Sequence, residues 1–385
     1  RVSPARPREA PSSERDEGPS ETAILTIDLD ALTANYRRLR DLASPAECAA
    51  VVKADAYGLG MAEAAPALSR AGCKTFFVAT LGEAKALRAL LPHAVIYVFA
   101  GLMPGTAELY RAHDLRPVLN SAEEIREWAS YAASQDEKLP CAVHIDSGMN
   151  RLGLSADEVD RVAEAPELWQ AMTLSLVMSH LACADEASHP KSEAQRQIFD
   201  RLRARLPAAL ASLANSAGIL LGRSYTYDLV RPGIALYGGH PRRHGKNPFE
   251  PVVHLKGRIL QVRNVAPGET VGYGATRTLH ETARVAVVSV GYADGFFRSL
   301  STKEGETGLV VYLGAHTAPV LGRVSMDLIT IDVTGVPKEI ACRGAWVELI
   351  GPNVSAQDMA HQAGTIDYEV LTNLGRRAAR RYIGG

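Results

Sequence analysis

Short apolar runs alternate with amphipathic stretches between residues 21 and 240 of the chain. The amphipathic stretches have apolar residues at helical spacing, such as Ile198 and Leu202, which is typical of helices that cover a sheet. A strand at Ala23–Ile27 and a helix at Asp30–Leu42, with Asp30 as N-cap, are expected first. The later runs predict eight strands, at Ala49–Val52, Thr75–Ala79, Ala94–Phe99, Pro117–Leu119, Ala142–Ile145, Leu174–Met178, Leu210–Leu213 and Tyr227–Val230. The later amphipathic stretches predict helices at Gly82–Leu91, Ser121–Ala133, Ser155–Glu164 and Lys191–Ala204. This alternation favours an α/β fold, a (β/α)₈ TIM-like barrel, over a doubly wound sheet.

The pattern changes after residue 240, where runs rich in β-branched residues are separated by turn signals such as Ala266–Gly268. These runs predict strands at Val252–Val265, Ala283–Val290, Gly308–Leu313, Ala318–Leu321, Leu328–Val333 and Ala345–Ile350. Two helices are expected near the end, at Ser355–Ala363 and Val370–Arg381, and the basic residues Arg376–Arg381 then complement the dipole of the last helix. We therefore predict a barrel over residues 21–240 and a C-terminal mainly β domain over 241–385. Residues 1–20 are rich in proline, serine and charge and are expected to form a disordered tail.

Composition narrows the possible partners. The 385-residue chain has a formal net charge of −1 and a pI near 6.9, which gives no reason to expect nucleic acid or an anionic membrane as partner. Its five cysteines form no C-x-x-C pair, which argues against a disulfide framework or a zinc knuckle and fits a reducing compartment. The sequence has no run of 18 or more apolar residues, so no membrane-spanning helix is expected. The absence of an apolar signal segment favours a cytoplasmic location, an argument weakened because the chain starts at Arg1 and not at Met.

Lys53 is the first candidate for chemistry. It ends the apolar run Ala49–Val52 and opens a loop that contains Gly58 and Gly60. The carboxyl ends of strands are where α/β folds build active sites, and a partly desolvated lysine there can attack a carbonyl to form a Schiff base. From the spacing alone, an ordinary surface lysine at a strand end is a better explanation than a Schiff-base lysine.

Polar residues follow other predicted strands at the same edge of the barrel. Asp146–Arg151 comes after one strand, and Arg151 could clamp a carboxylate or tune a nearby acid. His180 follows the next strand, where a hydrogen-bonded histidine near the core is the favoured interpretation of this residue in isolation. His180, Cys183 and His189 match no standard zinc spacing, so no metal is expected.

The loops after the last two predicted strands carry small residues. Asn215–Gly218 and Arg231–Ile234 leave backbone N–H groups and a hydroxyl open to an anion, at the usual phosphate seat of a barrel, although two ordinary turns fit these residues equally well. A nucleotide P-loop is not supported, because Gly239–Lys246 misses the required spacing and Asn247 replaces Ser or Thr. No G-x-G-x-x-G follows a strand, which argues against a dinucleotide cofactor.

The β region adds tyrosines beside glycines. Tyr273 lies between Gly272 and Gly274, and Tyr292 follows Gly291. A tyrosine in such a turn is free to approach a ligand, and a cationic neighbour can make its phenol a base. Most such tyrosines are structural.

Taken together, these motifs resemble the alanine racemase family over nearly all of residues 21–385. The family consists of pyridoxal phosphate enzymes with an N-terminal (β/α)₈ barrel and a C-terminal β domain. The motifs that carry the resemblance are V-K-A-D-A-Y-G at 52–58, D-S-G-M-N-R-L-G at 146–153, S-H-L at 179–181, A-N-S-A at 214–217, R-P-G-I-A-L-Y-G at 231–238, V-G-Y-G at 271–274, G-Y-A-D-G at 291–295, S-M-D at 325–327 and D-Y-E at 367–369.

The resemblance implies a role for each candidate residue. Lys53 would carry the Schiff base to pyridoxal 5'-phosphate and move the α-proton on one face of the substrate, and Tyr273 would be the second base on the opposite face, supplied across a homodimer interface. Arg231 would face the pyridine nitrogen and keep it unprotonated. Arg151 and His180 would tune Tyr273. The phosphate and the rest of the cofactor would be held by Tyr57, His180, Asn215, Ser216, Gly233, Ile234 and Tyr368. The substrate would meet Arg151, Tyr292, Asp327 and the backbone N–H of Met326.

The implied activity is interconversion of L- and D-alanine, which supplies D-alanine for peptidoglycan. At two positions the chain departs from the family. His144 stands where many members have a lysine, often carbamylated, that orients the arginine matching Arg151, so His144 could bond Arg151 directly or an anion could fill the gap. Leu59 replaces a common histidine. Three alternatives stay open: racemisation of another or several amino acids, a related decarboxylase, whose expected cysteine-containing segment is missing, and a non-catalytic pyridoxal phosphate-binding protein.

Overall fold

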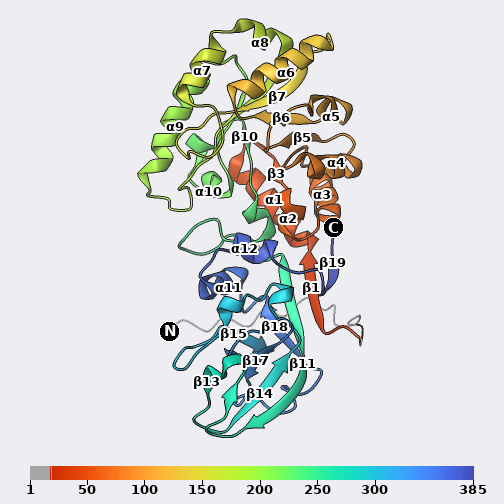
Figure 1. The fold of residues 1–385 in the computed structure, drawn as a ribbon, viewed down its shortest axis with the longest axis vertical. Coiled ribbons are helices and arrows are strands. Elements are labelled where there is room, and N and C mark those ends of the chain that lie inside the picture. Colours follow the sequence, from red (N-terminus) through yellow and green to blue (C-terminus); the bar gives the residue numbers. More distant parts are fainter. Residues whose placement is uncertain (1–17, 19) are drawn as a thin grey trace. The chain divides into compact units, whose positions relative to one another are not determined.

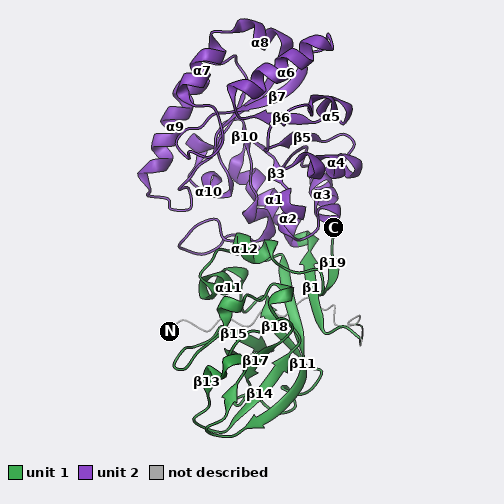
Figure 2. Cartoon of the chain, viewed as in Figure 1, with its two compact units in different colours: residues 1–30, 251–385 green, residues 31–250 purple. Residues whose placement is uncertain are grey.

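The structure is a computed structural model that describes residue 18 and residues 20–385. Most of the predicted tail, residues 1–20, lies outside the described residues. The chain forms two compact units (Figure 2). Unit 1 combines the residues up to Asp30 with Pro251–Gly385, and unit 2 is Ala31–Glu250.

Unit 2 is built on parallel strands. Seven strands form one sheet in chain order from β3 to β9, and β10 pairs in parallel with β2, which directly precedes β3. On its other side, β10 is bonded to the segment of β9. The backbone N–H of Arg231, just after β10, donates to the carbonyl of Ala214, just after β9, at 2.9 Å. The sheet thereby closes on itself, and the predicted TIM-like barrel is confirmed. The strands are β2 (Glu47–Cys48), β3 (Ala50–Val51), β4 (Thr75–Val78), β5 (Val95–Val98), β6 (Arg116–Leu119), β7 (Leu139–His144), β8 (Met172–Met178), β9 (Leu210–Ser212) and β10 (Leu229–Val230).

Helices connect these strands and cover the barrel. Thr80 and Ser155 form capping boxes with Glu83 and Glu158, which is why helices begin directly after them. α1 begins at Leu29, so Asp30 lies inside the first turn and is not the N-cap that the sequence suggested; an acid there still favours the helix dipole. The helices are α1 (Leu29–Ala43), α2 (Lys53–Tyr57), α3 (Met61–Arg70), α4 (Leu81–Leu90), α5 (Ala107–Ala112), α6 (Ala122–Ser134), α7 (Ala156–Ala163), α8 (Pro166–Ala171), α9 (Pro190–Arg203) and α10 (Ser216–Ile219), with 3₁₀ turns at Arg223–Tyr225 and Ile234–Tyr237.

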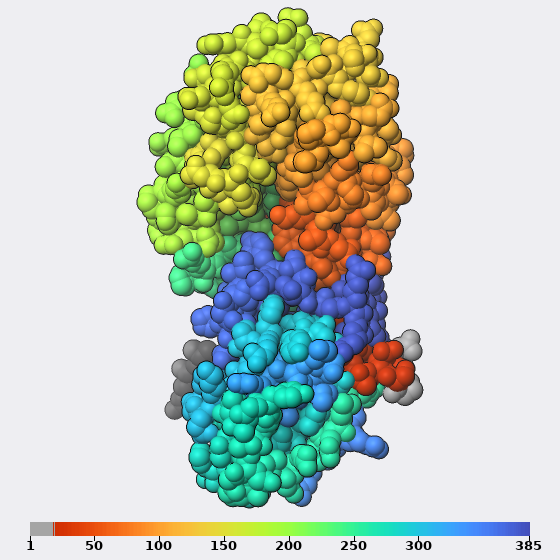
Figure 3. All heavy atoms as spheres, viewed as in Figure 1, coloured from red at the N-terminus to blue at the C-terminus, as the bar shows by residue number. Residues whose placement is uncertain are grey.

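The core of unit 2 lies between the strands and this helical layer. Phe76, Phe77, Leu119 and Val143 are fully buried there. In Figure 3 the surface of this unit changes from orange through yellow to green in chain order, because successive helices pack beside one another. The helices cover the sides of the barrel, so polar side chains for an active site are expected at the carboxyl ends of the strands.

Unit 1 is built on a mostly antiparallel sheet (Figure 1). Its strand order is β14-β17-β16-β15-β18-β11-β1-β19, and the long strand β11 also pairs with β14. Val311, Ile331 and Val347 are fully buried in its core. The strands are β1 (Ala23–Asp28), β11 (Val253–Val265), β12 (Thr270–Val271), β13 (Arg277–Thr278), β14 (Ala283–Val288), β15 (Val310–Leu313), β16 (His316–Leu321), β17 (Ile329–Asp332), β18 (Trp346–Ile350) and β19 (Ala379–Ile383). The helices are α11 (Ala356–Ala363) and α12 (Asp367–Thr372), with 3₁₀ turns at Tyr273–Ala275, Tyr292–Asp294 and Arg298–Leu300.

Two sequence predictions differ from the structure in unit 1. The first strand was assigned to the barrel segment 21–240, but β1 pairs antiparallel with β11 and parallel with β19. The helix predicted at Val370–Arg381 is wrong, because α12 ends at Thr372 and Ala379–Ile383 forms β19. The basic residues therefore do not end a helix. Local propensity missed both features because each is decided by strand pairing with a segment far away in the chain.

Candidate active site

Lys53 lies at the start of a left-handed turn directly after β3. Ala54, Asp55, Ala56 and Tyr57 all have φ between 53° and 56°, where the sequence analysis expected only a loop. This conformation costs non-glycine residues about 1–2 kcal/mol each. Hydrogen bonds hold it in place: the backbone N–H of Ala54 donates to Glu83 Oε1 at 2.7 Å, and that of Met61 donates to Asp55 Oδ1 at 2.8 Å. The strained turn fixes where the lysine side chain leaves the barrel.

The surroundings of Lys53 favour its neutral amine. Desolvation by burial lowers the pKa of Lys53, the positive charge of Arg151 lowers it further, and Glu83 partly opposes both. The ammonium nitrogen Nζ lies 5.8 Å from the centre of the Phe99 ring. A lysine with a lowered pKa is a better nucleophile and proton acceptor near neutral pH than a surface lysine.

Hydroxyl groups gather at the ends of β9 and β10. The Tyr57 ring stacks on Tyr237 with 4.7 Å between the ring centres, and the space beside Gly233 is filled by the Tyr57 phenol, since a Cβ at residue 233 would lie 2.1 Å from its oxygen. Ser216 Oγ accepts the backbone N–H groups of Gly233 and Ala235 at 3.0 and 3.2 Å. With both lone pairs used, the Ser216 hydroxyl can offer its proton to an anion.

Two further predicted residues belong to the same loops. Asn215 Oδ1 accepts the backbone N–H of Gly218 at 2.9 Å and so caps the short helix α10. Ile234 begins the 3₁₀ turn that follows Gly233. Both positions shape the loops, and the Asn215 oxygen is occupied by this cap.

Arg231 is the most deeply buried cation of the site. Its side chain is 2% exposed, and its Nη groups donate to Ser212 Oγ and to the Ser179 carbonyl at 2.5 and 2.6 Å. Burial lowers the pKa of Arg231 to about 9, so the group keeps its charge at neutral pH. The Nε–H of Arg231 is buried and has no hydrogen-bond partner among the described residues. An unpaired buried donor costs about 1–3 kcal/mol, and an aromatic nitrogen with a free lone pair would satisfy it.

Two neutral histidines lie near this cation. Burial, with the charges of Arg231 and Arg151, lowers the pKa of His144 to about 4 and that of His180 well below its usual range. The Nδ1 of His180 lies 3.5 Å from Arg231 Nη2. Both imidazoles are therefore uncharged at neutral pH and can accept a hydrogen bond.

The bonding of His144 identifies its tautomer. Its Nδ1 lies 2.9 Å from Asn120 Oδ1, and the amide nitrogen of Asn120 donates to the carbonyls of Phe99 and Val118. Asn120 Oδ1 must then accept, so His144 carries its proton on Nδ1 and presents Nε2 as an acceptor. The direct bond to Arg151 that the sequence suggested as one possibility is not among the hydrogen bonds of the described residues.

Arg151 follows a tight turn made by one carboxylate. Asp146 Oδ1 accepts the backbone N–H groups of Gly148, Met149 and Asn150 at 2.9, 2.9 and 3.1 Å. Arg151 itself is exposed. Its charge lowers the pKa values of Lys53, His144 and His180, which means that the fold brings all four residues to one site.

Sequence reasoning missed Gln195, which is fully buried on α9. Its amide nitrogen donates to the His180 carbonyl at 2.8 Å and to Ser147 Oγ at 3.3 Å, and its oxygen accepts the Ala182 N–H at 2.8 Å. Ser147 in turn lies 2.6 Å from Ser179, hydroxyl to hydroxyl. Gln195 thereby joins the loops after β7 and β8. A glutamine on the apolar face of an amphipathic helix was the signal that could have found it.

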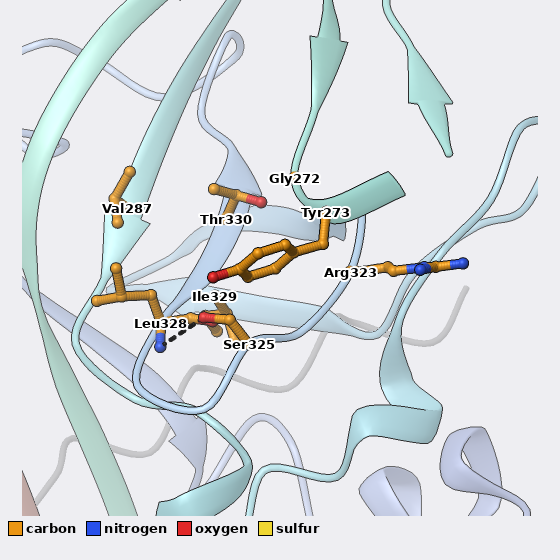
Figure 4. Close-up of a pocket in the computed structure, with 8 residues that line it drawn as sticks. All are labelled: Gly272, Tyr273, Val287, Arg323, Ser325, Leu328, Ile329 and Thr330. Atoms are coloured by element: carbon orange, nitrogen blue, oxygen red, sulfur yellow. Dashed lines mark hydrogen bonds between the residues drawn. The ribbon is translucent and has the colours of Figure 1, made fainter. Parts of the chain in front are cut away.

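Unit 1 contributes a tyrosine on a glycine turn. Tyr273 lies between Gly272 and Gly274, both at positive φ, and its side chain is 72% exposed. Figure 4 shows its ring over a pocket, with the hydroxyl pointing towards Leu328. Arg323 packs against the turn, because a Cβ at residue 274 would lie 2.9 Å from its Nη1. Glycine at residue 274 adopts its φ of 72° without strain, whereas a side chain there would be strained and would displace this arginine.

The other unit 1 candidates lie on neighbouring loops. The backbone N–H of Tyr292 donates to Ser325 O at 3.0 Å, which ties the 291–295 loop to the 325–327 loop that holds Met326 and Asp327. Asp327 Oδ1 accepts a hydrogen bond from Arg377 Nη1, and the Asp327 side chain is 58% exposed. Tyr368 lies in the first turn of α12 and is partly exposed. Within unit 1, Met326 and Asp327 are thus held beside Tyr292.

Two features are absent from the part of the chain that the structure describes. Among the described residues, no group of three or more His, Cys, Asp or Glu side chains is arranged to hold a metal ion. Within the same residues, no helix is long and apolar enough to cross a membrane.

Comparison with known proteins identifies the class and the family. The family sequence model of the alanine racemase N-terminal domain matches residues 27–241, and the family sequence model of the C-terminal domain matches residues 252–382. The alanine racemase of Methylobacterium sp. strain 4-46 is 52% identical over 361 residues, 94% of this chain and 98% of that protein. That of Rhodospirillum rubrum is 47% identical over 365 residues, 94% of this chain and 96% of that protein.

Solved structures agree. Alanine racemase from Bartonella henselae with covalently bound pyridoxal phosphate has a TM-score of 0.90 at 41% identity, covering 94% of this chain and 99% of that one. The biosynthetic alanine racemase of Pseudomonas aeruginosa has a TM-score of 0.87 at 35% identity, with 94% and 100% covered. These matches define the class as amino-acid racemases. The chain belongs to the alanine racemase family.

Proposed function

We propose that this protein interconverts L- and D-alanine with pyridoxal 5'-phosphate as its cofactor. The observation that carries the proposal is that Lys53, an amine with a lowered pKa, and Arg231, a buried cation whose Nε–H lacks a partner among the described residues, both act electrostatically on His180. A lysine can bind the aldehyde of this cofactor, and an arginine can donate to its unprotonated ring nitrogen. Family membership and the names of the relatives support the same reaction.

The residues present fit the cofactor. Lys53 would hold it covalently, Arg231 would donate to its ring nitrogen, and His180 lies beside that arginine. Its phosphate would be held by the hydroxyls of Tyr57 and Ser216 and by the loop residues Asn215, Gly233 and Ile234, with Tyr368 as a further hydroxyl. When bound, the cofactor supplies an electron-withdrawing ring that makes the α-proton of the amino acid acidic. Arg231, still charged at neutral pH, would keep the ring nitrogen unprotonated and so limit side reactions such as transamination.

Two bases would carry the proton. Lys53 Nζ would accept the α-proton on one face of the substrate while the Tyr273 hydroxyl donates a proton on the other face, and the reverse reaction exchanges these two roles. Removing a proton from one face and adding one to the opposite face inverts the centre without moving the substrate, whereas a single base would return the same enantiomer. Arg151 and His180 would tune the Tyr273 phenol. The backbone N–H of Met326 would hold the substrate carboxylate, and Tyr292 would narrow the entrance.

A homodimer would complete the site. Tyr273, Tyr292 and Met326 are large side chains that are 72%, 42% and 54% exposed in unit 1. Exposed apolar groups of this size mark interaction surfaces, and we propose that a second copy of the chain covers them. The supply of D-alanine for peptidoglycan is proposed as the biological role, and the cytoplasmic location expected from the sequence stays a prediction.

Proton exchange and chirality together test the proposal. Catalytic protein with pyridoxal phosphate is incubated with L-alanine in D₂O, the α-proton is followed by NMR, and the products are resolved on a chiral column. Loss of the α-proton signal with D-alanine rising to parity is expected. Exchange with retained L configuration would contradict the two-base reaction. No exchange with alanine, in protein yellow with bound cofactor, would direct the assay to serine and other amino acids.

A further inference from the structure

The basic segment near the C-terminus joins two loops of unit 1. Arg377 lies between α12 and β19, and its guanidinium forms a two-point pair with Asp294, Nε to Oδ1 at 2.9 Å and Nη2 to Oδ2 at 2.7 Å. Its Nη1 donates to Asp327 Oδ1 at 2.5 Å, and Nη2 lies 3.4 Å from the Met326 carbonyl. One side chain therefore holds both the 291–295 loop and the 325–327 loop.

Asp294 makes this attachment rigid. Its side chain is 2% exposed, and Oδ2 also accepts the backbone N–H of Gly291 at 2.9 Å. The backbone around Arg377 packs on the same loop: Gly375 N–H donates to Asp294 O at 3.1 Å, and a Cβ at residue 375 would lie 2.5 Å from Ala293 O. A buried carboxylate with two-point arginine pairing is expensive to separate, so Arg377 has little freedom to move.

In the 325–327 loop, the Met326 carbonyl accepts two hydrogen bonds. The Met326 carbonyl accepts the Ala293 N–H at 3.1 Å, in addition to its contact with Arg377. The backbone N–H of Met326 donates to no group among the described residues. That peptide unit is therefore oriented by its neighbours and leaves its donor free for a ligand.

Charge balance adds a second effect at the same place. Asp327 follows Met326 directly, and an unpaired carboxylate beside the free N–H would repel an anionic ligand. Pairing with Arg377 offsets part of that charge and turns the Asp327 side chain towards the arginine. Asp294 and Asp327 together outnumber the single cation, so the cluster itself is not a binding site for an anion.

We propose that Arg377 is a positioning residue for the substrate carboxylate. It fixes the 325–327 loop so that the Met326 N–H faces the carboxylate, and it offsets part of the charge of Asp327 beside that donor. This inference rests on the proposed function and deepens it, because it assigns to the C-terminal segment the binding of the amino acid but neither proton transfer nor cofactor binding.

The experiment measures KM and kcat for alanine in both directions in wild-type protein and in R377A, R377K and D327N, with R263A as the control. Arg263 is an exposed arginine of β11 in the same unit. Loss of a charge-assisted network predicts a KM roughly 10- to 100-fold higher in R377A, a smaller rise in R377K, and a smaller change in kcat. Inhibition by propionate, which has the carboxylate but no amine, should weaken by the same factor as KM rises. Cofactor affinity and the absorbance of bound pyridoxal phosphate should not change.

The double variant R377A/D327N separates the two effects. Removing the unpaired charge of Asp327 should reverse part of the rise in KM that R377A causes, which a purely structural role of Arg377 would not produce. An unchanged KM in R377A with normal cofactor content, or an equal fall in kcat and cofactor affinity, would overturn the inference. Should R377A not fold, R377K carries the same readouts. Inactivity of the wild-type protein on alanine would instead overturn the proposed function, so the two failures are distinguishable.

Discussion

In unit 2, Arg231 and His144 are almost wholly buried, each is hydrogen-bonded, and burial moves their pKa values to about 9 and about 4. In unit 1, Tyr273, Tyr292 and Met326 stand out from loops with much of their surface exposed. Both sets were singled out from short sequence motifs. The two sets nevertheless differ in burial, because the strands of the two sheets are connected differently.

The difference follows from topology. Parallel strands bring all their carboxyl ends to one edge, where successive loops desolvate one another and shift each other's charges. An antiparallel sheet sends its connections out as separate turns, which display side chains but do not enclose them. The buried half of the candidate site can therefore prepare its chemistry within one unit, whereas the displayed half needs a complementary surface. Each of the following changes tests one side of this contrast.

Replacing the amine of the buried half should have the largest effect. Lys53→Ala removes both the group that would hold the cofactor and one base, so alanine racemisation should fall by at least about 10³-fold. Racemisation and covalent attachment of pyridoxal phosphate, trapped by borohydride reduction, are measured together. Lys74→Ala, at an exposed lysine of unit 2, is the control. Full activity of Lys53→Ala would remove the basis of the proposal.

The displayed half is tested at Tyr273. Tyr273→Phe keeps the ring and loses only the hydroxyl, and racemisation should fall by roughly 10²- to 10⁴-fold. Exchange of the α-proton in D₂O should persist for one enantiomer, because Lys53 still serves its face. The control is Tyr312→Phe on β15. A non-catalytic carrier would lose nothing in either variant, and equal loss of exchange for both enantiomers would argue against opposed bases.

Close packing in the buried half is tested at Gly233. A methyl group there would meet the Tyr57 phenol at 2.1 Å and force the tyrosine out of its stack on Tyr237. Gly233→Ala should weaken pyridoxal phosphate binding by roughly 10- to 100-fold, the loss expected for one or two charge-assisted hydrogen bonds. Gly335→Ala has open space around its new methyl group and is the control. Cofactor titration followed by absorbance gives the answer, and an unchanged affinity would place the phosphate elsewhere.

The last effect expected is on the pH dependence of stability. The pKa of His144 is lowered from 6.5 to about 4, so below pH 6.5 the unfolded chain binds a proton that the folded protein does not. Stability should then fall as pH drops from about 6.5 to about 4, by up to ~3 kcal/mol from this group, and its contribution is constant above 6.5. Urea unfolding at a series of pH values should show a shallower fall in His144→Asn than in wild type. Equal slopes in the two proteins would mean that His144 titrates normally.

How much was predictable varies between residues. Lys53, Arg231 and the loops after β9 and β10 could be found because strand ends of a parallel sheet converge, and alternation alone predicts that sheet. Gln195 was missed because its hydrogen bonds go to loops distant in sequence. Asp327 was expected to meet the substrate, yet its carboxylate pairs with Arg377, a partner that no local pattern indicates.

The sequence by itself determined the barrel, the β domain and the family motifs, because hydrophobic period and turn chemistry act over a few neighbouring residues. Only the tertiary structure decided that β1 pairs with β11 and β19 and that His144 bonds Asn120. It also decided that the basic segment supplies Arg377, which pairs with Asp294 and Asp327, and then continues into β19. It also decided which side chains are desolvated. Those outcomes depend on pairing and burial between segments far apart in the chain, where local propensity is weak and long-range contacts dominate the free energy.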